Sequence, residues 1–501
     1  MKYRMQRDLF LAVDIGTTNV KGAVFQKENG DILDSISSKI PLHTDAERGV
    51  AEQNPLEIYK AVESLASYFA KKYGGKSISA IFLTSQMHAF GILDLTHKPK
   101  TNLLTYFDTR SRAFLGEIEE KGYELYLRTG CPPLHVYPLS KILLARRSGW
   151  LERRDRLLVS AKDYVLLRMT GHHVLDLSTA SGSQLLSING LTWDDLALEI
   201  AGVEESQLPQ LVEGSEKPLP LDSEFANNTG LSPDVEVYAG VSDASANQLG
   251  VGGSDSRRLA INLGTSAAVR FMVDHPVLDD PRMRFFLYYA GRKKYLAGGA
   301  VNNGGVILEW FLRSLGKAEL EFSRSTGEDV YSILDSMASS STPGANGIIA
   351  LPFLLGGERF PIRRPDAKAL FYGVQFHHTK KDLLRSLLEG VAFTLRMIYD
   401  ALCEKGLKAE SVSIGGSGSG MRTWRQIIAD VFGLSVYRPR TVESALLGAM
   451  LHYAETHSIK LELPVLEVAN LPNSSNMQAY QEAYKTFTQL VNLFYCNTRV
   501  D

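Results

Sequence analysis

The sequence has few cysteines and no strong excess of charge of either sign. Of its 501 residues only three are cysteines, Cys131, Cys403 and Cys496, and they lie far apart. An odd number at such spacing fits neither a disulfide framework nor a zinc site, and it favours a reducing compartment. The formal net charge is −2, so nothing indicates a nucleic-acid partner or a charged membrane surface.

Long apolar runs are also missing. No stretch approaches the ~20 apolar residues that a membrane span needs, and residues 1–8 are too polar and too few for a secretory signal. We therefore expect a cytoplasmic protein. The hydrophobic fraction of 44% and the charged fraction of 22% are ordinary for a globular protein. Because 501 residues exceed what one core usually organises, we expect two or three domains.

The first informative stretch, residues 9–25, is an apolar run that ends in an acid and a Gly-Thr-Thr turn. The Val- and Phe-rich runs on both sides of the turn predict a β-hairpin. Gly16 permits close approach of a ligand, and Thr17 and Thr18 add hydroxyl donors beside exposed N–H groups, which suits phosphate. Asp14 could hold hydrated Mg²⁺. A plain hairpin with its acid in water is the alternative.

A second copy of this stretch lies at residues 259–270. Its turn at 264–266 aligns without a gap on the Gly-Thr-Thr turn of the first copy. Asn262 takes the place of Asp14, so the second copy keeps the turn and loses the charge. Two such hairpins predict a duplicated domain with a nucleotide between the copies, in which one copy holds a metal ion and the other only phosphate oxygens.

Two segments of the first half carry side chains suited to a polyol. A short buried strand is predicted just before Gln86, Met87 and His88, where α/β proteins place ligand contacts. Asp108 and Arg110 lie two residues apart and could share hydroxyl groups. A structural loop and a solvated ion pair are the respective alternatives. The proline-rich segment 129–141, which follows, is expected to be a loop.

Asp243 stands at the junction between a strand predicted over 235–240 and an Ala-rich helix. In the first turn of that helix it would contribute ~1 kcal/mol as a substitute cap. As a general base it would lie where a substrate hydroxyl meets an incoming phosphoryl group. Its position between two phosphate-type hairpins favours the general base.

Glycine-rich segments mark the second half. Residues 297–305 lead into a predicted helix, and residues 415–420 include four glycines between a predicted strand and a helix. Such helix entries let anionic or ribose groups, or an aromatic base, lie against the backbone; tight helix packing and a flexible linker are the alternatives. The polar segment 252–256 is the expected boundary, which gives domains 1–253 and 254–501.

Taken together, these motifs resemble the FGGY family of carbohydrate kinases over nearly the whole chain. The resemblance rests on residues 14–18, 86–88, 240–250, 356–359 through 388–390, and 415–416 with 429–431. It implies an α/β fold of two duplicated actin-like (ribonuclease H-like) ATPase domains that close on ATP, Mg²⁺ and a sugar in the cleft between them.

The resemblance also implies roles for individual residues. Asp243 would be the catalytic base, and Asp14 would hold Mg²⁺. The nucleotide would contact Gly16, Thr17, Thr18, Lys21, Gly264, Thr265, Gly305, Gly415, Gly416 and Gly420. The sugar would face Gln86, Met87, His88 and Asp108.

Within the family, residues 129–141 and 300–305 most resemble gluconate kinases, with xylulokinase and other pentulose kinases as the runner-up. The expected reaction is therefore ATP-dependent phosphorylation of D-gluconate to 6-phosphogluconate. Gluconate needs a cation for its C1 carboxylate, and His135 and Lys141 are the candidates. Ala89, where many members have Gly, and the unusual segment 362–369 leave the substrate open.

An alternative hypothesis from a different functional class is a non-catalytic actin-like or chaperone-type ATPase, which shares the duplicated hairpin. Such a protein needs neither a sugar loop nor an acid at the position of Asp243. The expected partner is a small sugar or sugar acid, and a homodimer is compatible with the sequence.

Overall fold

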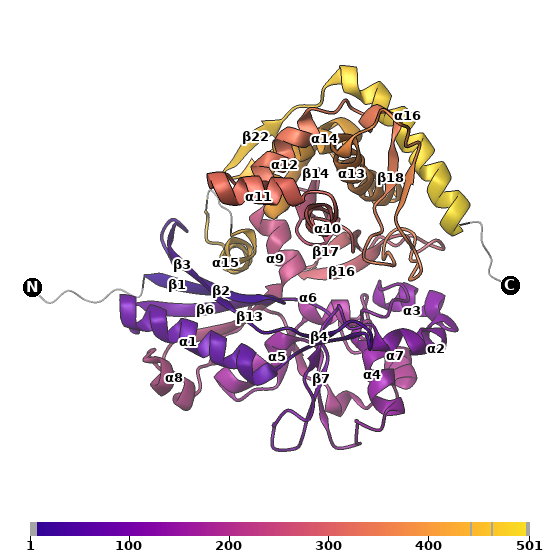
Figure 1. Cartoon of the computed structure of the whole chain (residues 1–501). Helices are drawn as coiled ribbons and strands as arrows, with labels where there is room; N and C mark the ends of the chain where they lie inside the picture. Colours follow the sequence, from indigo (N-terminus) through magenta and orange to yellow (C-terminus); the bar gives the residue numbers. More distant parts are fainter. Residues whose placement is uncertain (1–7, 441–442, 462–463, 497–501) are drawn as a thin grey trace, which may run out of the picture.

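The computed structural model describes residues 8–440, 443–461 and 464–496. Residues 1–7, part of the N-terminal segment judged above too polar and too short for a secretory signal, lie outside this range. Two large β-sheets form the centres of an N-terminal and a C-terminal half, which lie one above the other in Figure 1. Within the described residues, no helix combines the length and the apolar character needed to cross a membrane.

The first half is built on a six-stranded sheet in the order β12-β13-β6-β1-β2-β3. The strands are β1 (Leu9–Ile15), β2 (Asn19–Gln26), β3 (Ile32–Lys39), β6 (Ile78–Ser85), β12 (Leu219–Pro220) and β13 (Glu236–Ser242). β1, β2 and β3 form an antiparallel meander, whereas β1, β6 and β13 run parallel. The predicted first hairpin and the predicted strand before Gln86 are therefore confirmed.

Helices α1 (Pro55–Tyr73), α5 (Ala161–Thr170) and α8 (Ser223–Thr229) share one hydrophobic core with this sheet. At the start of α1 the Asn54 side chain caps the helix by accepting a hydrogen bond from the Leu56 N–H, and Pro55 occupies the first turn. Leu11 and Val13 point into this core. Since side chains alternate along a strand, Phe10 and Ala12 face the opposite side.

The second half contains a seven-stranded sheet in the order β16-β17-β15-β14-β20-β21-β22. The strands are β14 (Arg258–Leu263), β15 (Ala267–Val273), β16 (Phe286–Gly291), β17 (Lys294–Val301), β20 (Ser411–Gly415), β21 (Ser435–Pro439) and β22 (Leu466–Asn470). From β17 onward, the strand order and directions repeat those of the first sheet. The predicted duplication is confirmed, with β16 as an addition.

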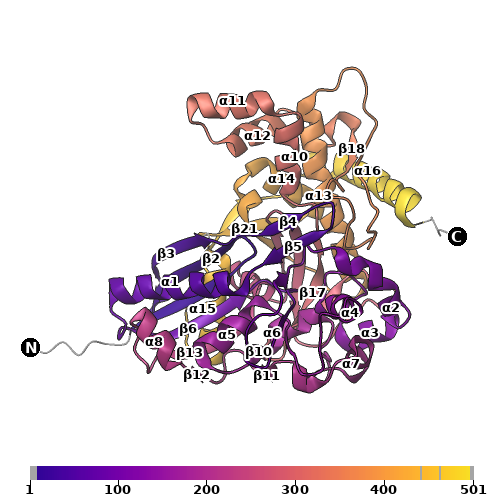
Figure 2. The same ribbon diagram turned by 60° about the horizontal axis from the view of Figure 1, so that its bottom comes forward.

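The remaining helices of the second half are α10 (Val306–Ser314), α11 (Lys317–Thr326), α12 (Val330–Ser339), α13 (Lys380–Glu404), α14 (Arg422–Phe432) and α16 (Ser474–Val491). α13 begins with a capping box, in which the side chains of Thr379 and Asp382 each bond the other residue's backbone N–H. α11 and α12 project from the second half in Figure 2.

Two helices cross between the halves. α9 (Asp243–Gly250) follows β13, and α15 (Ser444–Thr456) follows β21. A Cβ on Gly448 would overlap the carbonyl oxygen of Ala246, so only glycine permits this approach. α15 belongs to the second half by sequence but packs on the first sheet, where the Tyr453 ring lies 5.3 Å from that of Phe10 and 4.4 Å from that of Phe82. The boundary at 252–256 stays a prediction.

Smaller elements lie in the connections between the strands of each large sheet. The strands are β4 (His43–Asp45), β5 (Val50–Gln53), β7 (Gly91–Leu93), β8 (Leu103–Leu104), β9 (Arg156–Leu158), β10 (Val174–Asp176), β11 (Gln210–Val212), β18 (Ile349–Leu351) and β19 (Leu370–Tyr372). The helices are α2 (Leu115–Glu119), α3 (Gly122–Thr129), α4 (Pro138–Arg147), α6 (Leu177–Ala180) and α7 (Asp195–Ala201). The loop expected over 129–141 is wrong at its end, because α4 begins at Pro138, whose fixed φ suits the first helical position.

Candidate active site between the two halves

Asp14 and Asp243 lie at the same edge of the first sheet. β1 and β13 flank β6 as parallel neighbours, and Asp14 is paired with Thr84 while Ser242 is paired with Ser85. Asp243 follows Ser242 directly and opens α9. The carboxyl ends of parallel strands are where α/β proteins place ligands, so the topology brings the two acids together.

Both carboxyl groups are destabilised in their charged form. Burial raises the pKa of Asp14 to about 7, and the negative charge of Asp243 adds to this effect. Burial also raises the pKa of Asp243 to about 6, against the opposing charge of Arg270. Perturbed acids of this kind in a cleft are typical of functional sites.

The surroundings of Asp14 fit a divalent cation. Its Oδ1 atom is buried without a hydrogen-bond partner, and a cation would neutralise the repulsion between the two acids. No group of three or more His, Cys, Asp or Glu side chains suited to a metal occurs among the described residues. Mg²⁺ fits this pattern, because it commonly takes one or two carboxylates and completes its shell with water and phosphate oxygens.

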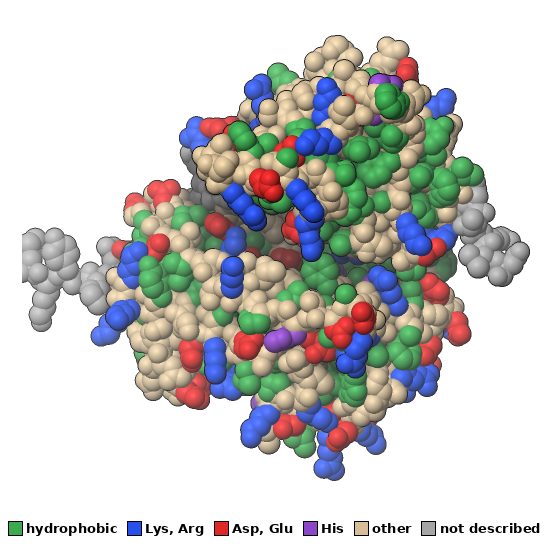
Figure 3. Space-filling view, viewed as in Figure 1, with side chains coloured by type: hydrophobic (Ala, Val, Ile, Leu, Met, Phe, Trp, Pro, Cys, Tyr) green, Lys and Arg blue, Asp and Glu red, His purple; other side chains and the backbone are tan. Residues whose placement is uncertain are grey.

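A cavity of about 170 Å³ lies beside Asp243, with walls from both halves. Its polar and aromatic lining comprises Thr17, Gln86, His88, Tyr106, Tyr137, Asp243, Asn247, Asn262, Ser266, Arg270, Tyr288 and Arg359, and Met87 is among its apolar walls. The predicted sugar residues Gln86, Met87 and His88 therefore share this sugar cavity with the predicted base. Figure 3 shows the surface hollowed between the two halves, with Lys and Arg side chains along the upper side of the furrow.

Neighbouring residues hold the polar side chains of Gln86 and His88 in place. Gln86 accepts a hydrogen bond from the Thr17 hydroxyl at 2.7 Å and donates to Gln53 Oε1 at 2.6 Å. His88 has a φ of 69°, and its Nδ1 lies 2.7 Å from the carbonyl oxygen of Gly182. Burial lowers the pKa of His88 to about 3, so the ring is neutral near pH 7. Its Nδ1–H donates to Gly182, which leaves Nε2 as an acceptor for a hydroxyl.

Asp108, His135 and Lys141 do not line the sugar cavity. Asp108 is fully buried and accepts hydrogen bonds from Arg110, at 2.7 Å, and from the Ala51 N–H, at 3.1 Å. The Lys141 ammonium donates to the carbonyl oxygens of three residues: His88, Leu104 at 3.3 Å and Thr105 at 2.8 Å. With three donors engaged, Lys141 has none left for a substrate.

His135 does not supply the expected cation either. It lines a neighbouring cavity, and burial lowers its pKa to about 3, so it is neutral near pH 7. The prediction from sequence placed the cation in the proline-rich segment because that segment resembles gluconate kinases. Which way its side chains point depends on the packing of α4, which the sequence does not reveal.

Two arginines that the sequence analysis missed provide positive charge in the sugar cavity. Arg270 lies on β15 and Arg359 follows the glycine-rich turn after β18. Within the described residues neither forms an ion pair with a carboxylate, and the Nε atom of each is buried without a hydrogen-bond partner. A signal for Arg270 existed in the sequence, because it is a lone charge inside the otherwise apolar strand 267–273.

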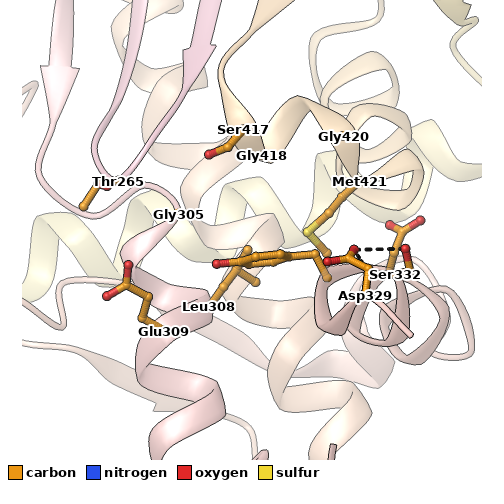
Figure 4. A pocket seen from close by; sticks show the side chains of 12 residues that line it. Thr265, Gly305, Leu308, Glu309, Asp329, Ser332, Ser417, Gly418, Gly420 and Met421 are labelled. Atoms are coloured by element: carbon orange, nitrogen blue, oxygen red, sulfur yellow. Dashed lines mark hydrogen bonds between the residues drawn. The ribbon is translucent and has the colours of Figure 1, made fainter. Parts of the chain in front are cut away.

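A second cavity, of about 290 Å³, lies within the second half (Figure 4). Leu308 and Met421 give it apolar walls, and Asp329 accepts hydrogen bonds from Ser332 at its edge. Its complete lining is Thr265, Gly305, Leu308, Glu309, Asp329, Tyr331, Ser332, Asp335, Ser417, Gly418, Gly420 and Met421. The predicted nucleotide residues Thr265, Gly305 and Gly420 lie here, and the mixture of apolar and polar walls suits a nucleoside.

Gly415 and Gly416 lie just outside this nucleoside cavity. Gly416 has a φ of 82°, and a Cβ there would lie 2.5 Å from the carbonyl oxygen of Leu263. Only glycine lets the loop turn past the end of β14 to bring Ser417 and Gly418 to the cavity. The two glycines therefore do not line the cavity themselves but determine the path of the loop that does.

The second hairpin separates the two cavities. Thr265 lines the nucleoside cavity, whereas its neighbour Ser266 lines the sugar cavity. The Gly305 N–H donates to the carbonyl oxygen of Gly264 at 2.6 Å and ties the entry of α10 to this turn. A phosphate chain running from one cavity to the other would have to pass this turn.

The first hairpin holds the remaining predicted nucleotide residues. The Gly16 N–H donates to the carbonyl oxygen of Asn19 at 2.9 Å, which closes the turn that carries Thr17 and Thr18. Lys21 is paired with Asp14 across β1 and β2. Its Nζ atom lies 3.0 Å from Glu443 Oε2, so this ion pair spans the two halves.

Comparison with known proteins identifies the family. Residues 9–250 match the N-terminal domain of the FGGY family of carbohydrate kinases, and residues 259–454 match its C-terminal domain. The chain belongs to the FGGY family of carbohydrate kinases. This FGGY kinase is thus a sugar kinase with the two-domain actin-like fold, and the alternative of a non-catalytic ATPase is set aside.

Curated relatives carry two substrate names. A gluconokinase of Bacillus subtilis (strain 168) is 34% identical over 444 residues, which cover 88% of this chain and 86% of the relative. A xylulose kinase of Escherichia coli (strain K12) is 27% identical over 492 residues, which cover 96% of this chain and 98% of the relative.

Solved structures divide in the same way. A gluconate kinase and a ligand-bound xylulose kinase, both from Lactobacillus acidophilus, each give a TM-score of 0.88 at 28% identity, covering 98% of this chain and 99% of the other. Overall structural likeness therefore does not separate the two substrates.

Proposed function

We propose that this FGGY kinase transfers the γ-phosphoryl group of ATP to the 6-hydroxyl of D-gluconate, giving 6-phosphogluconate and ADP. The observation that carries the choice of a sugar acid is the pair of arginines, Arg270 and Arg359, in the cavity that also holds Asp243. Guanidinium groups bind carboxylates through strong, charge-assisted hydrogen bonds. A C1 carboxylate would give the unpartnered Nε atoms of both arginines an acceptor.

In this proposal Asp243 is the general base. Its ionised carboxylate accepts the proton of the 6-hydroxyl as the hydroxyl oxygen bonds to the γ-phosphorus and the bond from that phosphorus to the β,γ-bridging oxygen breaks. ADP is the leaving group. Asp14 would hold Mg²⁺, which when bound neutralises charge on the phosphate oxygens.

The nucleotide would follow the path between the two cavities. Its nucleoside would occupy the cavity between α10, α12 and the loop at 417–421, and its phosphates would run past Thr265 toward Ser266. The first hairpin, with Gly16, Thr18 and Lys21, would contact the phosphates from the other half. Both halves would thus hold the reactants in line and exclude water.

A neutral pentulose such as xylulose is the second candidate, supported by the relatives that bear this name. A neutral sugar would offer hydroxyl groups to Arg270 and Arg359 but no counter-charge. Asp243 already offers Arg270 a counter-charge in this cavity, but Arg359 forms no ion pair within the described residues. A buried cation without a counter-charge is costly, which is the reason for preferring the sugar acid.

The test is coupled ADP formation with gluconate, xylulose, ribulose and glycerol on the wild type, Arg359→Gln and a control, Arg324→Gln, on the exposed surface of α11. We expect gluconate to give the highest kcat/KM and Arg359→Gln to lower it by roughly tenfold to a hundredfold, the size of a lost charge-assisted hydrogen bond, with the value for xylulose little changed. Arg270→Gln is a less selective test of carboxylate binding, since Arg270 also lowers the pKa of Asp243.

Either of two results would change the proposal. If xylulose gives the higher kcat/KM on the wild type, the pentulose reading replaces gluconate. If gluconate is preferred and neither arginine substitution affects it selectively, the carboxylate is bound by other residues.

A further inference from the structure

A third cavity adjoins the sugar cavity. It has a volume of about 220 Å³ and, like the sugar cavity, walls from both halves. Leu134 and Arg359 line both cavities. The site proposed above uses neither Arg112 nor Arg363, which also line this arginine cavity.

The three arginines of the arginine cavity lack ionic partners. Arg112 Nε lies 3.4 Å from His135 Nε2, Arg363 Nη2 donates to the carbonyl oxygen of Arg282 at 3.3 Å, and Arg359 Nη2 donates to that of Val301 at 3.4 Å. Within the described residues no carboxylate forms an ion pair with any of them. Arg359 is 93% buried, and its Nε has no hydrogen-bond partner.

Within the described residues, the acids that line the arginine cavity form no ion pair with its arginines. Glu358 already accepts hydrogen bonds from the Asn302 N–H at 2.6 Å, Asn303 Nδ2 at 3.0 Å and the Arg359 N–H at 2.8 Å. Glu119 is exposed to solvent on α2. Burial lowers the pKa of both Arg112 and Arg363, and the charges of Glu119 and Asp279 oppose this effect at Arg363 without forming an ion pair with it. These guanidinium groups have therefore lost hydration that no direct ion pair replaces.

We propose that the arginine cavity is a second anion site that takes a small oxyanion of the phosphate class. Three guanidinium groups around one cavity offer several N–H donors in the planar geometry that phosphate oxygens accept. Inorganic phosphate and the phosphate group of a phosphorylated sugar acid share this chemistry. Both anions can be present while a kinase of this kind is active.

Arg359 couples this site to the sugar cavity. One guanidinium cannot give its full hydrogen bonding to an anion on each side, so an oxyanion in the arginine cavity withdraws Arg359 from the sugar acid. The expected consequence is a raised KM for the sugar acid at unchanged kcat. This direction of coupling rests on the proposed function, whereas binding of the oxyanion does not.

Calorimetry with inorganic phosphate tests the binding directly. The full chain would be titrated at constant ionic strength, with saturating ADP and Mg²⁺ to cover the nucleotide loops. The variants are Arg112→Gln/Arg363→Gln and the control Arg324→Gln. We expect the wild type and the control to bind phosphate, and the double variant to bind at least about tenfold more weakly, as expected for a lost charge-assisted contact. Equal binding by the double variant, or no binding by the wild type at millimolar phosphate, overturns the proposal.

Kinetics and a fold check complete the experiment. Phosphate and 6-phosphogluconate, each added separately, should raise the KM for gluconate several-fold in the wild type and much less in the double variant. If only 6-phosphogluconate raises the KM and it does so equally in the double variant, the effect is product binding in the sugar cavity. If thermal melting shows the double variant to be unfolded, the two single variants replace it. Failure of gluconate turnover refutes the proposed function, while phosphate binding that survives both substitutions refutes this inference.

Discussion

The Asp243 carboxyl group and the Arg270 guanidinium line the same cavity, one from the start of α9 and the other from β15. The positive charge of Arg270 opposes the effect of burial on the pKa of Asp243. The positive charge of the buried Lys162, whose Nζ donates to the carbonyl oxygen of Val241 at 2.9 Å, also lowers the pKa of Asp243. Charges supplied from both halves therefore help to keep the base ionised near neutral pH.

Replacing Asp243 with Asn tests its role as the base. Asn has a similar shape but does not accept the proton, so kcat should fall by ~10²–10⁴ while the KM values for sugar and ATP change only a few-fold. Steady-state ADP formation at saturating substrate measures this. A kcat within about threefold of wild type would contradict the assignment.

The pH dependence of kcat/KM follows from the raised pKa of Asp243, which is about 6. The base must be deprotonated, so activity should be full above this value and should fall by about tenfold for each pH unit below it. Arg270→Gln removes a charge that favours the ionised form, so its midpoint should move to higher pH. A profile that stays flat down to pH ~5, or a midpoint that moves down in the variant, would count against this account.

The two hairpins should differ in their dependence on metal. Asp14→Ala removes the carboxylate proposed to hold Mg²⁺, and it should raise the Mg²⁺ concentration for half-maximal activity by about tenfold or more, equivalent to ~1.4 kcal/mol of binding free energy. Asn262→Ala, at the corresponding place on β14, is the matched control and should change it little. Equal effects would show that the division between the hairpins is wrong.

Lys141 should prove structural. Replacing it with Met leaves the His88 carbonyl group without its donor, whereas those of Leu104 and Thr105 still accept from the N–H groups of Phe90 and Asp108. Since a buried unsatisfied group costs ~1–3 kcal/mol, the free energy of unfolding should fall by about 1–3 kcal/mol. Urea unfolding measures this, with the exposed Lys98→Met as control. A selective loss of gluconate affinity with unchanged stability would instead restore Lys141 as a substrate contact.

Much of the fold could be predicted from the sequence because its turns and helix starts depend on local sequence patterns. The repeated turn at 16–18 and 264–266, the cap at Asn54 and the capping box at Thr379 are all patterns within a few residues. The position of Asp243 at a strand–helix junction was predictable for the same reason.

The cationic groups of the sugar cavity could not be predicted in this way. Arg270 and Arg359 reach one cavity from segments about ninety residues apart, and His135 and Lys141 turn away from it. Nothing in a linear sequence states that three backbone carbonyls will surround one lysine. The direction of a side chain in a loop or at a helix start is set by tertiary packing.

The crossing of α9 and α15 has a consequence for synthesis on the ribosome. The last strand of the first sheet ends at Ser242, but the helix that covers Phe10 and Phe82 is complete only at Thr456. At ~5–20 residues per second, roughly 10–40 s separate these two points. During that interval the apolar face of the nascent first sheet that carries Phe10 and Phe82 lacks the helix that covers it in the complete fold.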